Sequence, residues 1–175
     1  LSLLVPYRAM SAGTTMALGA NEIVMGAMGR LGPVDPTVTN DFNPEVETTE
    51  KDKKGKAKVG ISVEDVTAYL ALAKDRAGID TPEAMASVIR ILADKVHPLA
   101  LGNVHRQYLL IRSMSRRLLS LHMDPDRDKE RIDQIVDMLT EKLYYHGYGI
   151  SRHEAQKVIG LPITVPSEAI EKLMW

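Results

Sequence analysis

The chain has 175 residues, which is enough for one well-buried core but too few for two ordinary domains. Its 22 basic and 23 acidic residues nearly balance, so the composition gives no sign of a nucleic-acid-binding surface, and the lack of cysteine excludes disulfides, thiol catalysis and cysteine-based zinc sites. No apolar run approaches the roughly 20 residues that a helix needs to cross a bilayer.

The first unit that we predict runs from Leu1 to about Pro36. It contains an apolar strand over 1–5, a helix over about 12–20, a strand over 22–25 and a Gly/Pro turn. The chain opens with Leu1 rather than methionine, inside a strand that needs neighbours to satisfy its backbone groups. We therefore expect it to be a fragment of a longer protein.

A charged segment follows. Residues 37–58 begin with turn-forming residues and continue into a run rich in glutamate and lysine that has no apolar periodicity. This pattern favours a flexible surface loop.

From Ser62 onward the pattern is helical. Ser62 and Thr81 are predicted N-caps of two helices, and Pro98 ends the second of them. Two longer helices are predicted over about 101–122 and 127–145, a short helix lies between the capping box Ser151-x-x-Glu154 and Gly160, and a terminal helix follows Pro166. The arginines of the first long helix could bind an anion or nucleic acid, but the acidic residues of the second could pair with them, so we expect an intramolecular or subunit-interface role (Arg106, Arg112, Arg116 and Arg117; Asp128, Glu130, Asp133, Asp137 and Glu141).

Ser11 stands immediately before the first helix. Its hydroxyl would lie near the positive end of the helix dipole, with free backbone N–H groups beside it to receive an oxyanion. That position suits a nucleophile. It equally suits a simple N-cap, since serine is a favoured capping residue, so the local pattern leaves both interpretations open.

Ser11 belongs to a longer pattern. Ser11-Ala12-Gly13-Thr14 is followed by an Ala/Leu-rich helix, by Ile23-Val24-Met25 and by Gly32-Pro33-Val34-Asp35-Pro36. Later blocks are His97-Pro98-Leu99-Ala100-Leu101-Gly102-Asn103-Val104-His105-Arg106 and Leu143-Tyr144-Tyr145-His146-Gly147-Tyr148. The pattern resembles the ClpP-class serine peptidases, in particular the branch with SppA and the NfeD-type peptidases, and most of all the serine dehydrogenase proteinase family. No GxGxxG turn supports dehydrogenase chemistry.

The resemblance implies an α/β fold of the Clp/crotonase spiral type, of which this helix-rich chain would be the C-terminal portion. It makes Ser11 the nucleophile and the Ala12 amide one donor of the oxyanion hole. In the resembled family a Gly-Gly turn upstream of the serine supplies another donor, and no residue precedes Leu1 here. The oxyanion hole is then incomplete, which would leave the isolated chain inactive even if the longer protein is a peptidase.

A serine nucleophile needs a base. In the SppA and NfeD branches this base is a lysine, a few tens of residues after the serine, on the approach to the next helix. The matching stretch makes Lys58 the first choice here and Lys56 the second. Such a lysine must be desolvated enough to be neutral near pH 7. The alternative interpretation is that these lysines form a solvated charge run.

ClpP itself uses a Ser/His/Asp triad. No histidine occupies the matching region near Asp35, and an aspartate in a Gly-Pro-x-Asp-Pro turn ordinarily bonds its own backbone, so we assign Asp35 a structural role. His146 is expected at a helix C-terminus, where a cation is favoured, and the family block keeps it as an alternative base. The histidine spacing predicts no metal site.

The sequence thus predicts three segments: 1–36 with the nucleophile turn of the core, 37–61 as a charged flexible loop, and 62–175 as a helical portion that completes the core and forms an oligomerisation arm. The predicted function is a serine endopeptidase without a cofactor, acting on peptides or membrane-protein segments. A non-catalytic, oligomeric Clp-fold scaffold is the alternative, and acyl-CoA chemistry of the crotonase type is disfavoured because those enzymes do not use this serine. The resemblance also implies a homo-oligomer, no nucleic-acid partner, and membrane association through a segment outside this chain.

Overall fold

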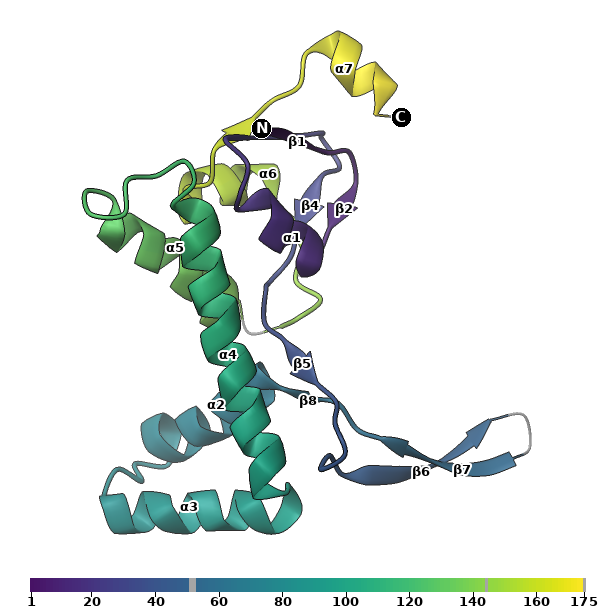
Figure 1. Cartoon of the computed structure of the whole chain (residues 1–175), viewed down its shortest axis with the longest axis vertical. Coiled ribbons are helices and arrows are strands. Elements are labelled where there is room, and N and C mark those ends of the chain that lie inside the picture. Colours follow the sequence, from purple (N-terminus) through teal and green to yellow (C-terminus); the bar gives the residue numbers. More distant parts are fainter. Residues whose placement is uncertain (51–52, 144, 175) are drawn as a thin grey trace. The chain divides into compact units, whose positions relative to one another are not determined.

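The computed structural model describes residues 1–50, 53–143 and 145–174, with the backbone alone at 49–50 and 53–54. The chain forms two compact units, which are Leu1–Asp35 together with Leu110–Trp175, and Pro36–Leu109 (Figure 1). Helices and strands occur in both units, so the α/β class predicted from the sequence is confirmed.

Two small sheets organise the first unit. One is parallel throughout, in the order β1-β3-β10 (Ser2–Val5, Glu22–Met25 and Ile163–Thr164). The other has the order β2-β4-β9 (Arg8–Ala9, Arg30–Leu31 and Ile150–Ser151), with β2 parallel and β9 antiparallel to β4. The chain alternates between the sheets, because β1 and β2 are followed by the helix α1 (Ala12–Ala17) and then by β3 and β4.

The core of this unit lies where the sheets meet α1, the end of α4 (Pro98–Leu119) and α5 (Lys129–Glu141). Helix α5 turns one apolar stripe inward, at the spacing that an amphipathic helix requires (Ile132, Ile135, Val136 and Leu139). Each such side chain contributes roughly 1.5–3 kcal/mol when it is fully buried.

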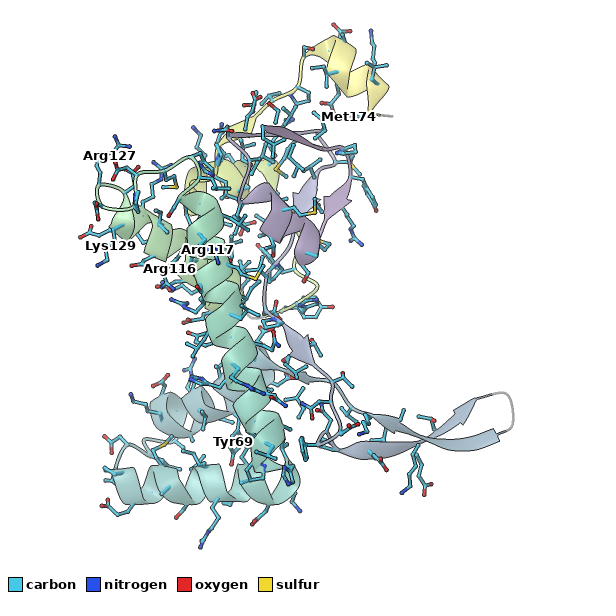
Figure 2. The ribbon with its side chains drawn as sticks, viewed as in Figure 1. Tyr69, Arg116, Arg117, Arg127, Lys129 and Met174 are labelled. Atoms are coloured by element: carbon cyan, nitrogen blue, oxygen red, sulfur yellow. The ribbon has the colours of Figure 1, made fainter. Side chains whose placement is uncertain are left out.

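Ion pairs join α4 to α5, as predicted. Arg112 contacts both Asp137 and Glu141, and the Arg116 Nε donates to Asp133 at 2.7 Å. Figure 2 shows Arg116 and Arg117 on α4, with Lys129 at the start of α5. The basic face of α4 is thus partly neutralised within the unit.

The C-terminal part follows the predicted caps. The Ser151 hydroxyl accepts from the Glu154 N–H at 3.2 Å, and it opens α6 (Arg152–Glu154), which continues as the π-helical turn η2 (Ala155–Ile159). Gly160 ends this turn at φ +87°, a conformation that glycine adopts without a Cβ clash. Strand β10 and the helix α7 (Glu168–Leu173) follow.

The described residues of the second unit form two antiparallel strand pairs and several helical segments, which include the first part of α4. Strand β5 (Thr37–Val38) pairs with β8 (Ile61–Ser62), and β6 (Glu45–Glu50) pairs with β7 (Lys53–Lys58), both antiparallel. The other helical segments are α2 (Val63–Ala71), the π-helical turn η1 (Leu72–Arg76) and α3 (Pro82–Lys95). The predicted caps are confirmed, since Ser62 accepts from the Asp65 N–H and Thr81 from the Ala84 N–H.

The prediction of a structureless loop over residues 37–58 is wrong in its secondary structure. The β6–β7 register places Glu45 opposite Lys58 and Glu47 opposite Lys56, so opposite charges face each other across the ladder. This cross-strand pairing has no apolar period and is therefore hidden from a hydrophobicity pattern. Lys51 and Asp52, which belong to the same predicted loop, lie outside the described residues. The three-segment division stays a prediction.

Several predicted helix boundaries also differ, among them the end of α5, which is Glu141 rather than about residue 145. Helix α4 begins at Pro98 rather than near residue 101, because proline is well suited to the first turn of a helix. The extended conformation of Val96 separates α4 from α3. Helix α1 ends at Ala17 rather than near residue 20, because the N–H groups of Gly19 and Ala20 bond three residues back and tighten the last turn.

Candidate active site

Ser11 occupies a strained turn between β2 and α1. Its φ of 45° and ψ of −101° make it the only non-glycine residue with positive φ among the described residues. A conformation of this kind costs about 1–3 kcal/mol and persists only where its surroundings fix it. The Ser11 side chain also forms no capping hydrogen bond. The capping interpretation therefore lacks the bond that it requires.

A buried threonine attaches this turn to β4. The Thr14 hydroxyl donates to the Ala9 carbonyl at 2.7 Å and accepts from the Gly32 N–H at 2.9 Å. Thr14 is completely buried, so neither bond competes with water. The last residue of β2, the first turn of α1 and the residue after β4 are thereby held together.

Asp35 and His146 form a hydrogen-bonded pair. The His146 Nδ1 lies 2.9 Å from Asp35 Oδ1 and 3.0 Å from Oδ2, across 111 positions of the sequence. Asp35 is only 3% exposed, whereas the His146 side chain is about half exposed. A buried carboxylate that holds one ring nitrogen fixes the imidazole and directs the other nitrogen away.

This pair differs from what the sequence suggested. Asp35 was expected to bond its own turn, whereas its carboxylate contacts a histidine 111 positions away. Helix α5 ends at Glu141, and His146 lies five residues later, in the connection to β9, so it is not the helix-terminal residue that we expected. Neither residue was among the first choices for a catalytic base. The signal available in the sequence was the family block around His146.

The sheet topology brings Ser11 to the same edge as this pair. Strands β2 and β4 are parallel and in register, so the segments that follow them, which contain Ser11 and Asp35, leave the sheet at the same edge. Strand β9 runs antiparallel to β4, so the segment that carries His146 enters β9 from that edge. The segments that carry Ser11, Asp35 and His146 therefore all lie at one end of the β2-β4-β9 sheet.

The two lysines named from the sequence lie on β7 of the second unit. The Lys58 Nζ lies 2.9 Å from Asp41 Oδ1, and the Lys56 Nζ lies 3.5 Å from Glu45 Oε2. The hydrogen bond from Lys58 lowers the pKa of Asp41 below its usual value, and the positive charge of the lysine adds to this effect. An ion pair stabilises the ammonium form, whereas a general base must be neutral.

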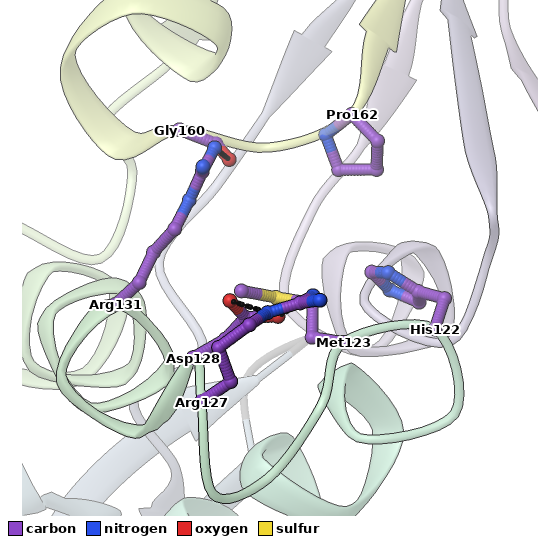
Figure 3. A pocket seen from close by; sticks show the side chains of 7 residues that line it. All are labelled: His122, Met123, Arg127, Asp128, Arg131, Gly160 and Pro162. Atoms are coloured by element: carbon purple, nitrogen blue, oxygen red, sulfur yellow. Dashed lines mark hydrogen bonds and ion pairs between the residues drawn. The ribbon is translucent and has the colours of Figure 1, made fainter.

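A cavity of about 260 Å³ lies elsewhere in the first unit, between the start of α5 and Gly160 (Figure 3). Its polar groups are engaged with the protein. Arg127 donates to both carboxylate oxygens of Asp128, and Arg131 donates to the Gly160 carbonyl at 2.8 Å. The His122 Nε2 lies 2.9 Å from the Leu18 carbonyl oxygen. None of the residues that line the cavity belongs to the Ser11 edge.

The described part of the chain holds no candidate metal cluster and no candidate membrane-spanning helix. No group of three or more histidine, aspartate or glutamate side chains there could hold a metal ion. None of the helices in these residues combines the length and the apolarity that crossing a membrane requires.

A comparison with known protein families finds a match that includes the segment around Ser11. The family model of the ClpP-like SDH-type serine proteinases matches residues 1–97, more than half of the chain, including the turn at Ser11 and Asp35. No curated protein and no solved structure gives a significant match. The chain belongs to the family of ClpP-like SDH-type serine proteinases.

Proposed function

We propose that this protein hydrolyses peptide bonds, with Ser11 as the nucleophile, His146 as the general base and Asp35 as the group that orients His146. One observation carries the proposal: the buried Asp35 carboxylate holds the His146 Nδ1 at the sheet edge where the strained Ser11 turn begins. The family membership supplies the reaction class.

The chemistry follows from these roles. The Ser11 hydroxyl attacks the scissile carbonyl while the His146 Nε2 takes its proton, and Asp35 stabilises the resulting imidazolium. His146 then returns the proton to the leaving amine, which leaves an acyl-enzyme that water cleaves by the same steps in reverse order. As the first residue of α1, Ala12 has a backbone N–H with no partner inside the helix, and we assign it to the oxyanion.

The lysine base remains the competing assignment. Lys58, and Lys56 after it, match the position expected from the SppA and NfeD branches. Their ion pairs with Asp41 and Glu45 argue for His146 instead.

The spiral form of the fold belongs to the same proposal. The chain passes through a strand of one sheet, a strand of the other sheet and a helix before it begins the next pair of strands. A repeat of strand, strand and helix supports a Clp/crotonase-type spiral. Peptide or membrane-protein substrates, a homo-oligomer and membrane association are further proposals that rest on the resemblance.

A fluorophosphonate probe tests the nucleophile. The intact protein should be labelled, Ser11→Ala should not, and peptide mapping should place the adduct on the segment that contains Ser11. Labelling that persists in Ser11→Ala would refute the assignment. Complete absence of labelling in the folded full-length wild type would favour the non-catalytic scaffold.

A second set of variants assigns the base. His146→Gln should slow labelling by at least about 10²-fold, because general-base catalysis typically contributes 10²–10⁴-fold. Lys58→Met and Lys56→Met serve as matched controls and should label at the wild-type rate. If Lys58→Met loses as much activity as we expect for His146→Gln, the base is the lysine.

A further inference from the structure

Thr14 joins three segments of the first unit through one buried hydroxyl. Its Oγ1 donates to the carbonyl of Ala9, where β2 ends, and accepts from the N–H of Gly32, directly after β4. A threonine hydroxyl has one proton to donate and can accept in return, so these two bonds satisfy it. The side chain is completely buried.

The two bonds bracket the strained nucleophile turn. Ser11 lies between Ala9 and Thr14, and within this turn the Gly13 N–H bonds the Met10 carbonyl at 2.8 Å. A Cβ placed on Gly32 would lie 3.4 Å from the Met10 Cα and closer still to its side chain, so the chain after β4 passes directly beside the residue that precedes Ser11. The same segment leads to Asp35 three residues later.

We propose that Thr14 is a positioning residue for the reaction. Its hydroxyl fixes the Ser11 turn against the segment that carries Asp35, and thereby keeps Ser11 aligned with the Asp35–His146 pair. This inference rests on the proposed function of Ser11. Without the hydroxyl, the Gly32 N–H and the Ala9 carbonyl lose their partner, the turn relaxes toward ordinary backbone angles, and attack by Ser11 slows.

The chain contains a matched control for the test. Thr140 is a second buried threonine of the same unit, and its hydroxyl donates to the Val136 carbonyl at 2.7 Å and accepts from Arg112 at 3.0 Å. Thr14→Val and Thr140→Val therefore remove equivalent pairs of bonds. Thr14→Ser removes only a methyl group and keeps the hydroxyl.

The measurement is fluorophosphonate labelling of the intact protein at a series of probe concentrations. Thr14→Val should reduce the labelling rate at saturating probe by about 10–100-fold, since misplacing a reacting group by about 1 Å costs on that order, while the half-saturating probe concentration changes less than threefold. Thr140→Val and Thr14→Ser should stay within threefold of the wild type.

Several results would overturn the inference. The inference fails if Thr14→Val labels at the wild-type rate. It also fails if Thr140→Val slows labelling as much as Thr14→Val does. Should Thr14→Val fail to fold, Thr14→Ser and Thr14→Cys replace it, because they differ in one atom and the protein has no other cysteine. Thr14→Cys should then be labelled at least fivefold more slowly than Thr14→Ser. Equal labelling rates in these two variants would refute the positioning role of Thr14. A wild type without labelling at Ser11 would instead refute the proposed function itself.

Discussion

Replacing Ser11 with glycine should stabilise the fold relative to replacing it with alanine. Both changes delete the hydroxyl, so they differ only in whether a Cβ remains at φ 45°. Relief of the strained backbone raises the free energy of unfolding by about 1–3 kcal/mol. The greater freedom of glycine in the unfolded chain lowers it by about 0.5–1 kcal/mol. The net advantage of Ser11→Gly is therefore about 1 kcal/mol. In a protein of this size that corresponds to roughly 2–4 °C in the melting temperature.

Thermal and urea unfolding of the two variants measure this difference. Thr15 supplies the control, because it lies inside α1, where glycine is less favourable than alanine by about 1 kcal/mol. The order of stability should thus be glycine above alanine at Ser11 and alanine above glycine at Thr15. If alanine is the more stable residue at both positions, the turn at Ser11 is not strained and the argument from its backbone fails.

Three other predictions concern the same unit. Asp35→Asn should slow fluorophosphonate labelling of Ser11 by about 10²–10⁴-fold, and labelling at the wild-type rate would exclude Asp35 from the site. Arg112→Met should lower the free energy of unfolding by about 1–3 kcal/mol, because the Arg112 side chain is largely buried, whereas the more exposed Arg116→Met should cost less than about 1 kcal/mol; equal losses in urea unfolding would contradict this reasoning. Hydrogen bonds from Arg127 lower the pKa of Asp128 from 3.8 to about 2, so this contact stabilises the fold above pH 4 and is lost as the pH falls toward 2. Arg127→Gln should raise that pKa back toward 3.8 in an NMR titration, and an unchanged titration would show that Arg127 is not the cause.

The parts of the fold that the sequence predicted well are those that local chemistry decides. Ser62, Thr81 and Ser151 each cap a helix through a side-chain oxygen that accepts an N–H three residues later. The stripe on α5 appears at its expected spacing because a helix repeats every 3.6 residues whatever it packs against. Such features need no knowledge of the rest of the chain.

The strands that build the candidate site have no comparable local signal. β2, β4 and β9 contain two residues each, which is too short for any alternation of polar and apolar positions. They exist because β2 and β4 lie side by side and β9 adds to them from more than a hundred residues away. Strands β6 and β7 could not be predicted from hydrophobicity for a different reason. Their residues are mostly polar, and their pairing depends on opposite charges across the ladder.

The proposed base, His146, has no local signal for the same reason. Sequence distance from Ser11 favoured lysines that follow within a few tens of residues, and it gave His146 no privileged position. The contact between His146 and Asp35 depends on β9 running antiparallel to β4, which turns the α5–β9 connection toward the segment that carries Asp35. A residue order of serine, aspartate and histidine along the chain follows directly from this topology. The order of these residues in the sequence is thus a consequence of how β9 joins the sheet, and the proposal of His146 as the base rests on its contact with Asp35 rather than on its spacing from Ser11.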